Sequence, residues 1–378
     1  MAQAYPAADI VAPPLHEHFS RHIEEARALG TRHLAPVPSI EAIATLVDAG
    51  FWASLRHEEG YLAKISLAFL RPGEASDPMI FERAIPLEPG ALAKVAPAVE
   101  RAGIHLGVWP DGGVLRVWGT TGAIPALCFV LEVAAAGLLV VKHHRGDGSG
   151  KFVNVAVLEG DSIKLVDEQA SSLPDCPDLL TSLLGFHSPA AWVDSVNVLV
   201  QLSVAMRQHG RGGSLLVVPS DGDLWRESIV HPIKYAAVPA YRALAELNRA
   251  SHEARQERAW QDALERAVGV IAGLTAVDGA TILTADYDLL GFGAKIARRR
   301  GSPLVTEVTV TEPIAGGTAE IVEPAFLGGT RHLSATQFVH DQRDAIALVA
   351  SQDRHFTIFA WSPCENMVHA HRVETLLL

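Results

Sequence analysis

The chain has 378 residues, of which 49% are hydrophobic and 20% charged, a balance that excludes an intrinsically disordered protein and allows two globular domains. Its formal net charge of -12 disfavours non-specific binding to nucleic acid, because neutralising phosphates requires clustered Lys and Arg. The 3 cysteines contain no CxxC pair, so the sequence indicates neither a zinc site nor a disulfide framework, and a reducing compartment suits it.

The first half of the chain reads as an α+β domain over residues 1–175, beginning with an irregular Pro- and Ala-rich arm over 1–37. Ser39 is the expected N-cap of the first helix. Apolar runs separated by turn residues then predict a mostly antiparallel sheet. The expected elements are helices at 40–47 and 92–102 and strands at 61–71, 104–109, 114–118, 128–133, 138–143, 152–158 and 163–166.

Residues 124–141, the most apolar stretch, leave two interpretations open. A membrane span is one, but the stretch is short and contains Glu132, which is costly inside a bilayer. A buried β-hairpin is the other, and we favour it. The N-terminus also lacks the basic segment and uninterrupted apolar core of a signal peptide. We therefore expect a cytoplasmic protein without a membrane partner.

Two pairs of histidines in this half raise the question of a metal site. They are His16 with His18, and His143 with His144. Neither pair has a third ligand at a spacing typical of a metal centre, so we interpret them as surface or loop residues.

The second half, residues 186–378, alternates strands and helices and predicts a mixed α/β sheet with a site at strand ends. A polar connection over 168–188 marks the domain boundary. The expected elements are a helix from Pro189, strands at 214–218, 276–284 and 287–295, a helical region at 240–274, a strand or helix start at 305–310, a loop at 311–330, a helix at 331–338, and final strands at 345–350 and 356–361.

Two short motifs in this half have the composition of a phosphate and metal site. The segment from Gly328 to His332 combines two glycines, a hydroxyl, Arg331 and a histidine at the start of a helix. Its backbone N–H groups and its charge-assisted Arg and His donors suit phosphate, and the helix dipole adds to them. Upstream, the motif Asp278-Gly279-Ala280 places an acid beside a tight glycine, which suits a metal ion.

With these motifs the second half resembles the diadenylate cyclase (DisA-N-type) domain. The resemblance rests on order and spacing across roughly residues 186–375. The matching segments are Gly213-Ser214-Leu215-Leu216-Val217-Val218, Asp278-Gly279-Ala280, Gly329-Thr330-Arg331-His332-Leu333-Ser334-Ala335 and Leu348-Val349-Ala350-Ser351-Gln352-Asp353. The first half looks like the sensor-type domains fused in front of some such cyclases.

The resemblance implies that two ATP molecules condense into cyclic di-AMP with release of two pyrophosphates, in a homo-oligomer whose catalytic domains face each other. It implies Mg²⁺ or Mn²⁺, with Asp278 as metal ligand and activator of the attacking hydroxyl. Arg331 and His332 join Asp278 as catalytic residues. The implied substrate-binding residues are Gly279, Ala280, Gly329, Thr330, Ser334 and Ser351.

This chain departs from the family pattern at two places. Leu333 stands where the family has a second basic residue, and Gln352-Asp353 replaces an acidic pair. A catalytically weak nucleotide-binding regulator on the same fold therefore remains an alternative, whereas the acidic charge disfavours a DNA-scanning protein. We expect His369 and His371 to be exposed to solvent rather than ligands.

Overall fold

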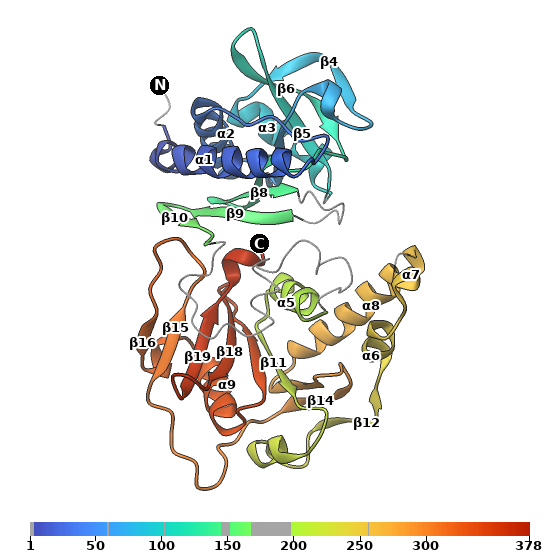
Figure 1. Ribbon diagram of the computed structural model, residues 1–378, viewed down its shortest axis with the longest axis vertical. Helices are drawn as coiled ribbons and strands as arrows, with labels where there is room; N and C mark the ends of the chain where they lie inside the picture. The colour runs from blue at the N-terminus through green and yellow to red at the C-terminus, as the bar shows by residue number, and fades with distance from the viewer. Residues whose placement is uncertain (1–3, 59, 102, 145–151, 168–197, 256) are drawn as a thin grey trace. The chain divides into compact units, whose positions relative to one another are not determined.

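The computed structural model describes residues 4–58, 60–101, 103–144, 152–167, 198–255 and 257–378 (Figure 1). The chain divides into two compact units, one comprising Met1–Val166 with Leu378 and the other Asp167–Leu377. The boundary expected over 168–188 lies outside the described residues, as does the expected start of a helix at Pro189. Both units combine helices and sheets, so the prediction of a mixed α/β protein is confirmed.

Unit 1 is built on an 8-stranded sheet in the order β10-β9-β8-β7-β3-β5-β6-β4. Strands β3 and β5 pair in parallel, and the other described neighbours are antiparallel, as the sequence predicted. The strands are β3 (Ile65–Phe69), β4 (Met79–Pro86), β5 (His105–Asp111), β6 (Val114–Thr121), β7 (Phe129–Ala135), β8 (Leu138–His144), β9 (Phe152–Glu159) and β10 (Ser162–Leu165), with a separate small pair, β1 (His57–Glu58) and β2 (Tyr61–Leu62).

The helices of unit 1 correct one prediction. They are α1 (Pro6–Ala28), α2 (Ile40–Ser54) and α3 (Pro89–Val95). The expected irregular arm is wrong, because α1 fills most of it. Its prolines suggested a loop, yet Pro6 occupies the first turn, where proline is tolerated. The residues Val11, Leu15, Phe19 and Ile23 recur every four positions and bury one face of the helix.

The apolar stretch over 124–141 is confirmed as a hairpin of β7 and β8. Glu132 on β7 forms an ion pair with Lys142 on β8, which compensates the charge that argued against a membrane span. Within the described parts of the chain, we find no helix both long and apolar enough to cross a bilayer.

Unit 2 is built on a 9-stranded sheet in the order β12-β14-β13-β11-β17-β18-β19-β15-β16. The pairs β11–β13 and β15–β19 are parallel, and the others are antiparallel. The strands are β11 (Gly213–Val218), β12 (Tyr235–Tyr241), β13 (Ala280–Thr284), β14 (Leu289–Ala294), β15 (Val308–Thr311), β16 (Glu320–Val322), β17 (Ile346–Ala350), β18 (Phe356–Ser362) and β19 (Met367–Arg372). The helices are α5 (Val198–Gln208), α6 (Ala243–Asn248), α7 (His252–Arg255), α8 (Arg258–Thr275) and α9 (Thr330–Asp341).

The central strand β11 shows why helices cover both faces of this sheet. Its side chains alternate, so Leu215 and Val217 belong to a core that includes residues of α5 and α8. Leu216 and Val218 belong to a second core that includes residues of α9. The sheet therefore fixes α9 on the face opposite α5 and α8, with its first turn near the beginning of β11.

Several boundaries in unit 2 differ from those predicted. The helical region at 240–274 is three helices, and the loop at 311–330 contains β16. Strand β13 starts at Ala280 rather than at 276, so Asp278 precedes the strand. The expected exposure of His369 and His371 is wrong: both are 1% exposed on β19, a strand that the sequence did not predict because its histidines interrupt the apolar pattern.

Candidate functional site

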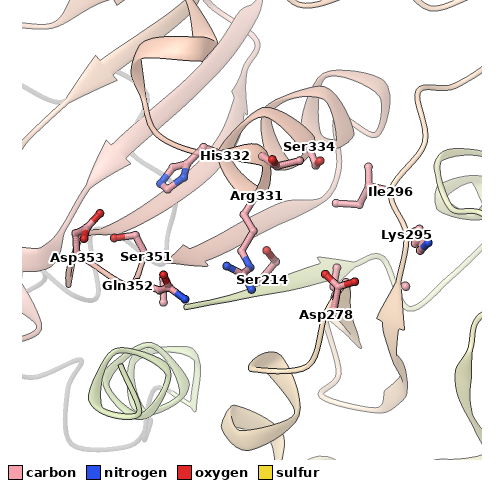
Figure 2. Close-up of a pocket in the computed structure, with 16 residues that line it drawn as sticks. Ser214, Asp278, Lys295, Ile296, Arg331, His332, Ser334, Ser351, Gln352 and Asp353 are labelled. Atoms are coloured by element: carbon pink, nitrogen blue, oxygen red, sulfur yellow. The ribbon is translucent and has the colours of Figure 1, made fainter. Parts of the chain in front are cut away.

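The candidate site is a cavity of about 620 Å³ in unit 2, where several chain segments meet (Figure 2). Strands β11 and β13 begin there side by side, since Leu215 pairs with Thr281 in parallel register. Strand β17 ends there, because it runs antiparallel to β11 with Val349 opposite Ser214. The first turn of α9 and the end of β14 complete the wall.

All the site residues predicted from the sequence line this one cavity. They are Asp278, Gly279, Ala280, Gly329, Thr330, Arg331, His332, Ser334 and Ser351. The structure also places in the wall Ser214, which lies in a matching segment but has no expected role, and Lys295 and Ile296, which belong to no motif. Ser214 looks like an ordinary residue of a buried strand, and the other two reach the cavity only because β14 pairs with β13.

The first turn of α9 presents backbone donors to the cavity. Its N-cap is Gly329, which has no side chain to cap the free N–H groups of the turn. The N–H groups of His332 and Leu333 turn back to the Gly329 carbonyl, at 2.9 and 3.4 Å. The uncapped N–H groups ahead of them, together with the helix dipole, favour an anion at this position.

Arg331 extends from this turn into the cavity, toward Ser214 (Figure 2). Gly212 makes room for it, since a Cβ atom there would lie 3.1 Å from Arg331 Nη1. In the part of the chain that the structure describes, the Arg331 guanidinium has no ion pair with an acidic side chain. Its charge and its planar donors are therefore available for a phosphate.

His332 lies deeper, with 4% of its surface exposed. Gly328 packs against its ring, where a Cβ atom would come within 2.7 Å of His332 Nδ1. Burial first, and then the nearby charges of Arg372, His355 and Arg331, lower the pKa of His332 to about 4. The imidazole is therefore neutral near pH 7, and the expectation that His332 adds a charge-assisted donor needs correction.

Asp278 stands on the opposite side of the cavity from α9 (Figure 2). It is exposed, and within the described residues its carboxylate forms no ion pair. The adjacent Gly279 has a φ of +101°, and a Cβ atom there would lie 2.5 Å from the carbonyl carbon of Gly293. The glycine therefore allows a close approach between β14 and the residues just before β13, in addition to the contact with substrate that the resemblance implies for it.

Ser351 lines the cavity and also stabilises the turn that follows β17. Its Oγ accepts the His355 N–H at 3.2 Å, and its own N–H donates to the His355 carbonyl at 2.9 Å. These bonds close the turn between β17 and β18. The hydroxyl hydrogen of Ser351 is still able to donate to a ligand.

The acidic residues of the cavity bear on the implied metal ion. Among the described residues, no group of three or more His, Cys, Asp or Glu side chains could hold a metal by itself. Asp278 and Asp353 nevertheless both line the cavity. Mg²⁺ is commonly held by one or two carboxylates together with substrate phosphates, so the residues present fit an ion that arrives with a nucleotide.

Comparison with known proteins concerns unit 1. The profile of a family described as "Probable sensor domain DACNV" matches residues 32–122. Unit 1 carries a probable sensor domain. The match spans α2, α3 and strands β1 to β6, and it ends well before the segments that form the cavity. No curated protein matches the chain.

Proposed function

We propose that the chain is a diadenylate cyclase whose activity is controlled by its sensor domain. The observation that carries the proposal is the convergence of two distant motifs, Asp278-Gly279-Ala280 and Gly329-Thr330-Arg331-His332, on one cavity of unit 2. A DACNV sensor domain in unit 1 supports it, since that type of domain is typically associated with diadenylate cyclases. In this proposal the protein acts in the cytoplasm.

The phosphate chain of ATP lies against the first turn of α9. The free N–H groups of that turn and the Arg331 guanidinium bind its oxygens, while Thr330 and Ser334 contribute hydroxyls. Lys295 adds a second positive charge from the end of β14. His332, being neutral, donates or accepts one hydrogen bond without adding charge.

In the reaction, the 3′-hydroxyl oxygen of one ATP attacks the α-phosphorus of the other. One P–O bond forms at the 3′-oxygen, one breaks toward the β-phosphate, and pyrophosphate leaves; repetition in the opposite sense closes the ring. Asp278 accepts the hydroxyl proton and would hold Mg²⁺ or Mn²⁺, which neutralises phosphate charge. Each protomer holds one ATP, so turnover requires two catalytic units face to face.

The test is to incubate the full-length protein with ATP and either Mg²⁺ or Mn²⁺ and to measure cyclic di-AMP by mass spectrometry. We expect product from the wild-type chain and none from Asp278→Asn, whose amide cannot accept the proton. A wild-type protein that binds ATP but yields no product with either metal would contradict the cyclase.

A nucleotide-binding regulator is the second candidate, and one observation favours it. Leu333, at the position where the resemblance expects a basic residue, is 43% exposed and lines a neighbouring groove rather than the cavity. One guanidinium is therefore missing from the helix that binds phosphate. The same assay separates the two candidates, since a regulator binds ATP and returns it unchanged.

A further inference from the structure

A groove beside the cavity carries a second candidate contact with the substrate. It has a volume of about 620 Å³ and shares Ile296 and Ser334 with the cavity, so the two spaces adjoin. We infer that Arg298, on the wall of this groove, binds the terminal phosphates of the nucleotide. The inference rests on the proposed function, because it assumes that ATP occupies the cavity.

The backbone of Arg298 is fixed on both sides. Before it, the Ala297 N–H donates to the Ser228 carbonyl at 2.9 Å. After it, the Arg299 N–H donates to Oδ2 of Asp341 at 2.8 Å. An exposed arginine on a flexible loop would lose much side-chain and backbone freedom on binding, whereas this one begins from a backbone that is already held.

The end of α9 holds the following residues of the same loop. Asp341, whose side chain is completely buried, also accepts the hydroxyl of Ser302. Gln337 donates to the Pro303 carbonyl at 3.1 Å and accepts the Val305 N–H at 3.2 Å. The helix that begins at the cavity therefore also positions the groove, at its opposite end.

Three consecutive arginines differ in what they contact. Arg299 pairs with Glu227 at 2.7 Å, and Arg300 lines a separate cavity of about 700 Å³. Arg298 lines the groove, and within the described residues it forms no ion pair and no side-chain hydrogen bond. Glu323 lines the same groove without pairing with Arg298, so it leaves the positive charge available.

The groove also explains which part of the nucleotide would reach Arg298. Asp278 lines the cavity but not the groove, and it marks the place of the reacting α-phosphate. A phosphate chain that runs from there along α9 passes Ser334 before it reaches the groove. Arg298 would thus contact the pyrophosphate that leaves.

The experiment compares affinities of the full-length protein, with Mg²⁺, for α,β-methylene-ATP, which cannot release pyrophosphate, and for AMP. We expect Arg298→Ala to weaken binding of α,β-methylene-ATP by about 10- to 100-fold, the usual effect of one charged hydrogen bond. Binding of AMP should be unchanged, because AMP lacks the terminal phosphates. Arg298→Lys should recover part of the loss.

Arg300→Ala is the matched control, since it removes the same charge two residues away and faces the other cavity. If Arg298→Ala lost equal affinity for the two ligands, or if Arg300→Ala had an equal effect, the role of Arg298 would be overturned while the proposed function would stand. A wild-type protein that binds neither ligand would overturn both this inference and the proposed function. Unchanged thermal midpoints would show that the variants remain folded.

Discussion

Gly279 offers the sharpest test of how the cavity is built, because its surroundings leave no room for a side chain. Its φ of +101° is a conformation that other residues adopt only at a cost. A Cβ atom at this position would lie 2.5 Å from the carbonyl carbon of Gly293 and 2.8 Å from both its Cα and its oxygen. These neighbours are backbone atoms of β14, so no side chain can rotate away to relieve the overlap.

The expected cost of Gly279→Ala has two parts. The positive φ costs roughly 1–2 kcal/mol for a residue with a Cβ atom. Displacing the β14 backbone costs roughly 1–3 kcal/mol, as for other overpacked sites. We therefore expect the free energy of unfolding to fall by about 2–5 kcal/mol, and the displaced strand end to move Lys295 and Ile296 in the cavity wall.

The assay is urea unfolding followed by tryptophan fluorescence, with hydrogen exchange to locate the change. Gly269→Ala is the control: this glycine lies exposed within α8, and a Cβ atom there meets nothing within 4 Å. Because alanine favours a helix over glycine, that variant should gain up to about 1 kcal/mol. Faster exchange in Gly279→Ala should be confined to β13 and β14.

A Gly279→Ala protein that unfolds at the wild-type urea concentration would refute this reasoning. It would mean that β13 and β14 separate at little cost in free energy and that the fold does not require Gly279. Any requirement for this glycine would then come from ligand binding. Normal stability combined with lost ATP binding would support this second explanation, which agrees with the substrate-binding role that the family resemblance implies for Gly279.

Three further outcomes are expected. Arg331→Ala should lower ATP affinity about 10- to 100-fold in a binding titration, and Arg331→Lys should restore only part of it, because lysine lacks the planar pair of donors. Asp341→Ala should lower the free energy of unfolding by about 2–3 kcal/mol, since the buried Gln337 amide and the partly buried Ser302 hydroxyl and Arg299 N–H lose their acceptor. Burial, and then His369, lower the pKa of His371 to about 3. Unfolding therefore takes up a proton as pH falls below about 6.5, so acid lowers the free energy of unfolding. The slope of this dependence is about 1.4 kcal/mol per pH unit between roughly pH 4 and 6, and His371→Asn should remove it.

The sequence predicted those features of unit 2 that are encoded within a few neighbouring residues. The glycines at 328 and 329 and the residues after them define a helix start, and α9 begins at Thr330. The residues of the two motifs could be named because each motif is local. Lys295 could not be named, since it reaches the cavity through the pairing of β14 with β13, which no local pattern specifies.

The wrong predictions concern residues whose usual structural preference, such as proline for a loop or histidine for the surface, is overridden by packing. Pro13 and Pro14 suggested a break, but α1 continues through them because Leu15 and Phe19 bury its apolar face in the core of unit 1. His371 suggested solvent, yet Nδ1 of its ring lies 2.6 Å from Thr311 Oγ1 on the adjacent strand β15. In both cases the local preference is overridden by a contact with residues that are distant in the sequence.

The distribution of positive charge around the cavity bears on the positions where this chain differs from the diadenylate cyclase pattern that it resembles. Leu333 supplies no charge, and the pKa of His332 is too low for it to supply any near pH 7. On α9 itself only Arg331 faces the cavity with a charge, while Lys295 and Arg298 come from the segment that follows β14. If this segment replaces the missing guanidinium, ATP affinity should depend on residues that a search for the helix motif alone would overlook. The comparison of Arg298→Ala with Arg331→Ala then tests whether Arg298 compensates for the uncharged Leu333 or whether the site is left with weaker ATP binding.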